Sequence, residues 1–473
     1  MLFNSFNFFI FLPVVFFLYW FVINKSLKIQ NIFLLVASYF FYAFWDWRFL
    51  FLLIFSTLLD FITATKISDA NNLKHKKYWF LLGVIINLGF LGFFKYCNFF
   101  IDSFANAMAL VGLKANTHSL NIILPVGISF YTFHGLSYLI DAYRNRIKPE
   151  KNFIDYAVFV CFFPLLVAGP IERATHLLPQ IKRKRAFSLD MFNEGIVQII
   201  VGLFRKIVIA DTLAIIVDSI YENAETHNTT SIIIATVFYA FQIYFDFAGY
   251  SDIAIGTGKL LGFSLLKNFN FPYFSKSLTD FWRRWHISLS SWLKDYLYIE
   301  LGGNRNGALK TYRNLMLTML LGGLWHGSNG TFIVWGGIHG LVLGIEKFVH
   351  AKSYFGFLNR FSFLGYITTF LVVLFAWIFF RSPNLHTAFV IIANIAKLDF
   401  GLPFIGNTNV FANALLVLFI GFGFDVFLFT KNIELSFLGS TMGFIKRVLF
   451  ISTVLLLTFL FYSDSTNFIY FQF

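Results

Sequence analysis

Charged side chains are the most informative shortage in this 473-residue sequence. Aspartate, glutamate, lysine and arginine make up 13% of the chain, whereas hydrophobic residues make up 58%. A soluble domain carries about 25% charged residues, so this chain has too few charges to cover a water-exposed surface. Lipid must therefore be the solvent for much of the molecule. The apolar runs are long and uninterrupted, which predicts membrane helices and excludes the alternating pattern of an outer-membrane barrel.

Cysteines and metal-ligand patterns are scarce as well. The two cysteines, Cys97 and Cys161, lie inside apolar stretches and form no disulfide framework. No pair of histidines or cysteines has the spacing of a metal site, so we expect no metal and no other bound cofactor. The segment 256–262 (GTGKLLG) is an incomplete phosphate-loop motif and follows no strand.

Positive charge, by contrast, is in excess, with a formal net charge of +13 at pH 7. The basic residues gather in short loops between apolar runs, which is typical of the cytoplasmic loops of membrane proteins and does not indicate a nucleic-acid partner. Together the runs and loops predict one all-α integral membrane domain over 1–473. We expect about ten to twelve membrane segments, some of them re-entrant, and a multi-pass position in the inner membrane. The last four spans are predicted at 361–380, 385–398, 411–430 and 445–462.

Charge and polar breaks also predict how individual segments run. Residues 31–65 are too long for one helix, and the polar break at 46–48 divides them into a hairpin. Residues 98–112 are interrupted by polar side chains, which indicates an interfacial segment. Residues 154–168 lie between two basic loops and are therefore expected to be re-entrant. The loop 221–230 has two acidic residues and no basic one, as expected outside the cell.

The stretch 280–297 (DFWRRWHISLSSWLKDYL) predicts one amphipathic helix in the membrane interface. At 100° per residue its tryptophans share an arc of about 100°, and Arg283, Arg284 and Lys294 occupy the opposite side. His286 falls at the edge of the aromatic face. The pattern fits a functional histidine, and it also fits an interfacial histidine without chemistry.

A second histidine is predicted deep in the membrane. Residues 314–346 have basic residues beyond both ends, so the segment must enter the membrane and return to the same side. His326 lies at the turning point, roughly 20 Å along a helix inside a hydrocarbon core of about 30 Å. Such a group is a functional hypothesis by default, and histidine is the natural general base for a hydroxyl. The alternative is a structural histidine bonded to a neighbouring helix.

Other polar residues of the region 245–346 are possible supporting groups. His339 lies about 140° round a helix from His326, so it shares the site only if the turn between them rearranges the two. Trp325 and Asn329 flank His326. Asp246 and Asp252 stand among glycines, where they could orient a histidine, line a tunnel or form buried hydrogen bonds without chemistry.

Three segments together resemble the membrane-bound O-acyltransferase family, in particular the branch of bacterial alginate and peptidoglycan O-acetyltransferase membrane subunits. They are 245–263 (FDFAGYSDIAIGTGKLLGF), 268–305 (NFNFPYFSKSLTDFWRRWHISLSSWLKDYLYIELGGNR) and 322–340 (GGLWHGSNGTFIVWGGIHG). The likeness extends over nearly the whole chain. It implies a ring of helices around a central tunnel, with the family's catalytic histidine at His326 and its second histidine at His286.

The resemblance also implies substrates and partners. Acetyl-CoA is the expected donor on the cytoplasmic side, where Arg283, Arg284, Lys294 and Arg305 can attract its phosphates. The acceptor is a hydroxyl of an exported polysaccharide, such as alginate or peptidoglycan, or a serine of a periplasmic partner, namely an SGNH-type or related acetyltransferase subunit. Membrane lipid surrounds the helices.

Three other interpretations stay open. The first keeps the family but transfers D-alanine from a carrier protein to teichoic acid. The second is a polysaccharide or lipid transporter without acyl chemistry, although the internal repeats common in transporters are not found here. The third is a membrane scaffold without catalysis. The sequence also leaves open whether transfer is direct or passes through an acyl-histidine or a partner serine.

Overall fold

The computed structural model describes residues 1–113, 120, 122–167, 169–351 and 362–462. Over these residues every regular element is a helix and no strand is present, which confirms the predicted all-α class. Helices are the expected solution in lipid, because they satisfy their backbone hydrogen bonds internally.

Six helical stretches within the described residues are long and apolar enough to cross a membrane. Two shorter apolar helical stretches, Phe6–Val22 and Leu385–Ala396, accompany them. The predicted ten to twelve segments also include shorter and broken helices, and the stretch 27–68 holds two helices that are separated at Trp47–Phe49. The six stretches are Leu27–Ser68, Leu73–Leu110, Thr229–Leu260, Gly330–Val349, Phe363–Arg381 and Thr408–Thr430.

The chain divides into two compact units. The first holds Met1–Ser188 and Gly258–Leu265, and the second holds Leu189–Thr257 and Leu266–Phe473. All of the predicted core region 245–346 except Gly258–Leu265 therefore belongs to the second unit. The interpretation of 1–473 as one membrane domain around a tunnel stays a prediction.

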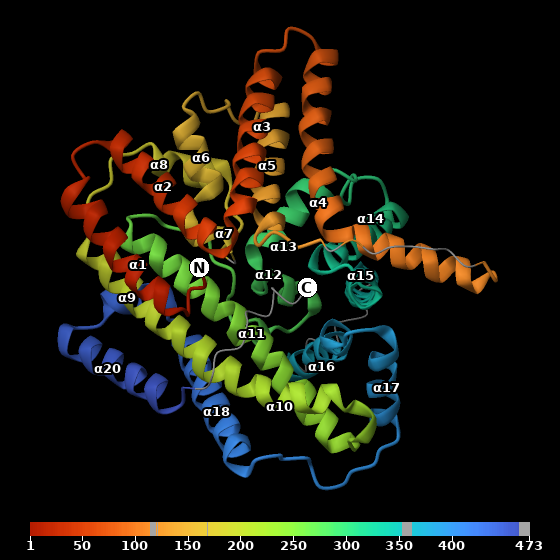
Figure 1. Ribbon diagram of the computed structural model, residues 1–473. Helices are drawn as coiled ribbons and strands as arrows, with labels where there is room; N and C mark the ends of the chain where they lie inside the picture. The colour runs from red at the N-terminus through yellow and green to blue at the C-terminus, as the bar shows by residue number, and fades with distance from the viewer. Residues whose placement is uncertain (114–119, 121, 168, 352–361, 463–473) are drawn as a thin grey trace. The chain divides into compact units, whose positions relative to one another are not determined.

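In the first unit the predicted break at 46–48 is confirmed, because the turn Trp47–Phe49 separates two helices there, and their return to one side of the membrane stays a prediction. The carboxylate of Asp46 accepts hydrogen bonds from the backbone N–H of Arg48 and from its guanidinium, so it ends one helix and caps the next. Helices α3, α4 and α5 then pack together (Figure 1). The helices of this unit are α1 (Phe6–Phe17), α2 (Leu27–Asp46), α3 (Leu50–Ser68), α4 (Leu73–Leu110), α5 (Ile128–Tyr143), α6 (Phe153–Cys161), α7 (Phe163–Leu166) and α8 (Ala174–Ile181).

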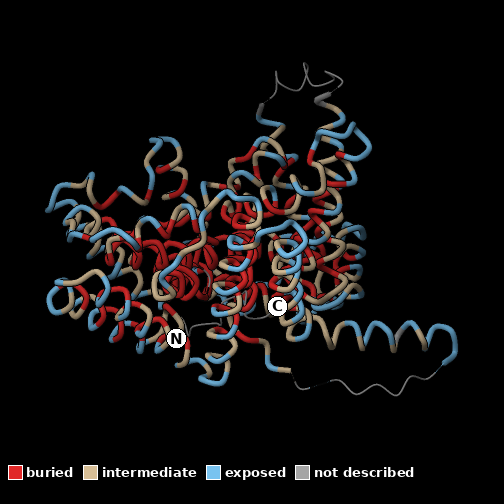
Figure 2. Tube along the Cα trace, turned by 90° about the horizontal axis from the view of Figure 1, so that it is seen from above, coloured by how far each residue is buried: buried red, intermediate tan, exposed pale blue. Residues whose placement is uncertain are grey.

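Two further segments of this unit were predicted to be interfacial and re-entrant, and both stay predictions. The interfacial segment expected at 98–112 is the end of α4, which runs away from α3 and α5 in Figure 1 and is largely exposed in Figure 2. The segment expected to be re-entrant is broken at Phe162, between α6 and α7, and its residues are buried. Residue 168 of that segment lies outside the described residues.

The second unit is built around α11, which is buried along most of its length. The last two predicted spans appear as α18 and α20, and the two before them as α16 and α17. Its elements are α9 (Leu189–Leu203), the π-helical η3 (Phe204–Ala210), α10 (Asp211–Glu222), α11 (Thr229–Leu260), α12 (Leu278–Arg284), α13 (Ile287–Leu293), the π-helical η6 (Lys294–Tyr298), α14 (Ala308–His326), α15 (Gly330–Ala351), α16 (Ser362–Arg381), α17 (Leu385–Ala396), α18 (Thr408–Thr430), α19 (Leu438–Thr441) and α20 (Phe444–Leu460).

Helices α14 and α15 form the predicted hairpin and pack at backbone distance. A Cβ atom on Gly323 would lie 2.2 Å from the carbonyl oxygen of Phe332, and one on Gly336 would lie 2.3 Å from that of Met319. Only glycine permits so close an approach. The pairing fixes the turn of the hairpin, which carries His326.

Candidate active site

His326 is the last residue of α14, and Gly327 follows it in an extended conformation. The imidazole is enclosed by aromatic rings: its centroid lies 5.1 Å from that of Trp335 and 5.2 Å from that of Phe380. His326 keeps 3% of its surface exposed, whereas His286 and His339 keep none. All three histidines are buried, and His326 is the least completely buried of them.

Asn329 fixes the turn that follows His326. Its amide nitrogen donates a 2.5 Å hydrogen bond to the carbonyl oxygen of Pro383, and its side-chain oxygen accepts one from the backbone N–H of Thr331. The first bond ties the turn to the connection between α16 and α17. Asn329 therefore contributes to the site by holding the hairpin turn in place.

His339 is brought beside His326 by the hairpin and not by the periodicity of one helix. The indole of Trp335 lies between the two imidazoles, with its centroid 4.7 Å from that of His339. The indole N–H of Trp282 donates to Nδ1 of His339 at 3.3 Å, so the neutral ring carries its proton on Nε2. Among the described residues, neither that Nε2 nor Nε1 of Trp335 has a hydrogen-bond partner. Two buried N–H donors therefore stand near this turn, one on Trp335, whose ring contacts His326, and one on His339, whose ring contacts the same indole.

The single amphipathic helix predicted over 280–297 is wrong. Helix α12 ends at Arg284, and His286 adopts a left-handed conformation with φ of 42° before α13 begins. A strand-like segment takes over the backbone bonding: the N–H of Asn270 donates to the carbonyl of Arg284, and the N–H of Ile287 donates to that of Asn268. The break turns His286 into the core. The sequence analysis had instead predicted that it lies at the edge of an interfacial helix face.

The side chain of Asn268 holds His286. Its amide nitrogen donates to the hydroxyl of Ser251, so its oxygen is the acceptor that faces Nδ1 of His286 at 3.3 Å and the hydroxyl of Ser288 at 2.6 Å. The imidazole proton is therefore assigned to Nδ1, and Nε2 is the acceptor. Burial lowers the pKa of His286, which lies outside the candidate spans, to about 3, so this ring is neutral at physiological pH.

The three histidines alternate with indole rings in one aromatic cluster. The centroid of Trp325 lies 6.0 Å from that of His286 and 5.0 Å from that of His326. We call the five side chains His286, Trp325, His326, Trp335 and His339 the histidine–tryptophan row. A neutral imidazole in such surroundings can accept a hydroxyl proton, and the neighbouring N–H groups can bind a developing negative oxygen.

Asp246 and Asp252 bind two basic residues that the sequence reasoning missed. Lys206 lies 2.8 Å from a carboxylate oxygen of Asp246, and Arg205 lies 2.6 Å from one of Asp252. Arg205 also pairs with Asp425 of α18. Both cations lie on the π-helical η3, inside the apolar stretch 195–220. Charged residues within a membrane segment are a signal for function or buried pairing, and that signal was available in the sequence.

The predicted donor-binding residues lie on the polar elements around α12. Arg283, Lys294 and Arg305 are exposed and have no ion pair among the described residues. Arg284 instead bonds to Asp280 at 2.9 Å. Three cations are therefore available to an anionic ligand.

Comparisons with known proteins agree with the resemblance in the sequence. The model of the membrane-bound O-acyltransferase family matches residues 142–385, which include the three histidines of the row. The probable alginate O-acetylase AlgI of Pseudomonas syringae pv. tomato is 47% identical over 385 residues, which cover 80% of this chain and 72% of the relative. The peptidoglycan O-acetyltransferase of Helicobacter pylori is 39% identical, with 83% and 79% covered. The teichoic acid D-alanyltransferase of Bacillus subtilis is 29% identical, with 56% and 71% covered.

Proposed function

Because the chain belongs to the membrane-bound O-acyltransferase family and is an O-acyltransferase with several membrane helices, we propose that it transfers an acetyl group to a hydroxyl of an exported polysaccharide. Relatives named for O-acetylation of alginate and peptidoglycan match four-fifths of this chain. The relative named for D-alanyl transfer matches 56% of it at lower identity. Acetyl transfer is therefore favoured over D-alanyl transfer, and family membership favours an enzyme over a transporter or a scaffold.

The proposed donor is acetyl-CoA from the cytoplasm, with the enzyme in the bacterial inner membrane. The exposed and unpaired cations Arg283, Lys294 and Arg305 support this donor, because positive charge raises the local concentration of a phosphate-bearing ligand. All three lie in the basic part of the chain that the positive-inside rule assigns to the cytoplasm.

His326 is the proposed general base. Its imidazole accepts the proton of the acceptor hydroxyl while the hydroxyl oxygen attacks the thioester carbonyl. The tetrahedral intermediate then collapses, the C–S bond breaks, and the CoA sulfur leaves with the proton from His326. His326 is the least completely buried histidine of the row and stands at the hairpin turn, and these two observations support the assignment.

The neighbours of His326 have proposed roles in the same step. The N–H groups of His339 and Trp335 bind the carbonyl oxygen as it becomes negative, since both donors are buried and unsatisfied among the described residues. His286 is neutral and packs against Trp325, so it positions this indole beside the reacting ring. The acceptor is either the polysaccharide itself or the serine of a periplasmic SGNH-type partner, which then passes the acetyl group on.

The test is transfer of label from acetyl-CoA by the purified full-length protein carrying His326→Ala. We expect transfer to fall by at least about 100-fold, the range of a lost general base, with unchanged yield and thermal stability. The matched control is His386→Ala on α17, because His386 is an exposed histidine outside the row. Transfer by the His326→Ala protein at the wild-type rate would contradict the mechanism.

A further inference from the structure

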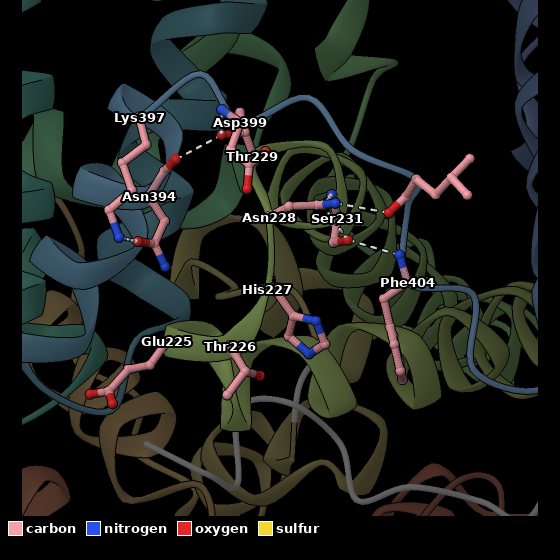
Figure 3. Close-up of a pocket in the computed structure, with 11 residues that line it drawn as sticks. Glu225, Thr226, His227, Asn228, Thr229, Ser231, Asn394, Lys397, Asp399 and Phe404 are labelled. Carbon is pink, nitrogen blue, oxygen red and sulfur yellow. Dashed lines mark hydrogen bonds between the residues drawn. The ribbon is translucent and has the colours of Figure 1, made fainter.

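A polar hollow of about 420 Å³ lies in the second unit, away from the histidine–tryptophan row. Its walls are the connection between α10 and α11 with the first turn of α11, and the end of α17 with the segment that follows it (Figure 3). The volume falls within the range of pockets that hold small ligands, about 300–1,000 Å³.

Hydrogen bonds between the two segments preform the hollow. The side-chain amide of Asn228 donates to the carbonyl oxygen of Leu402 at 2.8 Å, and the backbone N–H of Phe404 donates to the hydroxyl of Ser231 at 2.8 Å. The hydroxyl of Thr229 donates to the carbonyl oxygen of Asn394 at 2.7 Å. A ligand therefore meets walls that are already ordered, which lowers the entropic cost of binding.

Other side chains of the hollow do not take part in the hydrogen bonds that join its two walls. The carboxylates of Glu225 and Asp399 have no hydrogen bond or ion pair among the described residues, and Lys397 bonds only to the neutral amide of Asn394. The ring of Phe404 packs against the imidazole of His227, with centroids 4.7 Å apart. Figure 3 shows His227 and Phe404 on one side of the hollow and Lys397 with Asn394 on another.

These groups match the surface of a sugar. The hydroxyl groups of a sugar donate to carboxylates and accept from an ammonium group, while its C–H faces pack on aromatic rings. The hollow holds two carboxylates, of Glu225 and Asp399, and one ammonium group, of Lys397. This net negative charge would repel a chain of uronic acids. The composition of the hollow therefore suits a neutral or N-acetylated sugar.

The position of the hollow suits an acceptor. The loop 221–230 carries acidic and no basic residues, which the positive-inside rule assigns to the outer face. Helix α17 begins just after Pro383, the residue to which Asn329 ties the turn of His326. Its 12 residues span about 18 Å and end at the hollow. A polymer held in the hollow is thus within one short helix of the connection next to the reacting histidine.

We propose that this hollow is an outer binding site for a neutral or N-acetylated segment of the polysaccharide acceptor. The inference rests on the proposed function, because it identifies the class of the acceptor. It predicts that a neutral polymer is bound in preference to a polyuronate such as alginate.

The experiment measures binding to the purified full-length protein without any acyl donor. The probes are a β-1,4-linked N-acetylglucosamine tetrasaccharide and a mannuronate tetrasaccharide, observed by saturation-transfer NMR and titrated. We expect the first probe to bind. The Phe404→Ala variant should bind it with about tenfold lower affinity, the effect of one lost aromatic contact. The double variant Glu225→Gln/Asp399→Asn should bind the neutral probe more weakly and should bind the mannuronate probe more tightly than the wild type does.

The matched control is Glu222→Gln, because Glu222 is an exposed carboxylate near the hollow that does not line it. The inference is overturned if neither probe binds, if the uronate binds more tightly, or if the Phe404→Ala variant binds as the wild type does. The inference is also overturned if no sugar binds and these variants lose binding to a periplasmic protein partner. That result would assign the hollow to protein docking. His326→Ala should bind the probe normally, so a failure here and a failure of the acyl-transfer mechanism are separate results.

Discussion

At the scale of single residues, the hairpin turn of α14 and α15 explains how a histidine comes to stand among aromatic rings with little exposure. Charge alone predicted that His326 stands at the turning point, because basic residues on both sides require the segment to return. His339 could not be placed in this way. On one helix its direction differs from that of His326 by about 140°, and only the antiparallel pairing of two helices puts both rings against Trp335.

The proposed donor role of His339 predicts a graded loss of activity. His339→Phe keeps the aromatic packing but removes the N–H group, so kcat should fall about 100-fold, the usual cost of one lost oxyanion donor. His339→Gln retains an N–H donor and should recover part of that loss. The measurement is kcat and KM for acetyl transfer with labelled acetyl-CoA.

The split between kcat and KM separates this role from a structural one. A donor to the developing oxyanion acts on kcat with little change in KM. The control is Trp282→Phe, which removes the hydrogen bond to Nδ1 of His339 but leaves Nε2 in place. Equal kcat values for the Phe and Gln variants of His339 would contradict the donor role.

The buried charges show another limit at the residue scale. The sequence shows Asp246 and Asp252 as acids among glycines, but the cations that pair with them lie 40 and 47 residues earlier. Asp425 lies even farther along the chain and beyond the residues that match the family. Pairing at such separations is set by how α9, η3, α11 and α18 pack, and no local pattern encodes it. Breaking such a buried pair usually costs about 3–5 kcal/mol, so these side chains hold the helices around the site in place.

At the scale of elements, hydrophobic periodicity failed to predict the helix break at His286, a predicted site residue. The stretch 280–297 has a continuous helical pattern, but the structure breaks it at His286, with a left-handed conformation there. A non-glycine residue in this conformation costs roughly 1–3 kcal/mol and persists only where the surroundings impose it. Here the backbone of Asn268 and Asn270 imposes it, and the amphipathic pattern contains no sign of that contact.

The glycines of the α14–α15 hairpin give a prediction with a control in the next position. In the Gly336→Ala variant the new Cβ would stand 2.3 Å from the carbonyl oxygen of Met319, so the two helices must separate and the turn of His326 must shift. We expect a loss of about 1–3 kcal/mol in stability, as for overpacking, together with a large loss of acetyl transfer. Thermal unfolding in detergent and the transfer assay measure the two effects.

Gly337→Ala is the matched control, because its nearest neighbour would be the Leu320 side chain at an ordinary 3.7 Å. This variant should unfold and react as the wild type does. Similar behaviour of the two alanine variants would show that the close approach of α14 and α15 does not position the site.

At the scale of the whole molecule, composition and loop charge predicted the class of fold and most of its order. The low charge content required membrane helices, and the predicted spans at the C-terminal end correspond to α16, α17, α18 and α20. The division into two compact units was not predicted, because it depends on which helices pack together. Hydropathy describes the solvent that each helix faces, and it does not describe its neighbours.

The orientation of the chain in the membrane gives the last prediction. The protein carries Cys97 and the buried Cys161, so replacing Cys97 by alanine leaves little background for a thiol reagent. Asn223 is exposed in the acidic connection between α10 and α11, and Lys310 is exposed in the first turn of α14, next to a basic connection. The positive-inside rule places Asn223 outside and Lys310 inside. A membrane-impermeant maleimide added to intact spheroplasts should therefore label Asn223→Cys and leave Lys310→Cys unlabelled.

After permeabilisation both positions should react, which controls for their accessibility in the folded protein. The result also tests the proposed donor side, since the proposed donor is cytoplasmic acetyl-CoA and Arg305 lies close to Lys310 in the sequence. Labelling of Lys310→Cys in intact spheroplasts would put the free cations on the side without the donor. Failure to label Asn223→Cys in intact spheroplasts would place the loop 221–230 inside, where an exported polysaccharide would not meet the polar hollow. The donor side and the acceptor site are thus tied to one measurement, because both follow from the same distribution of basic residues.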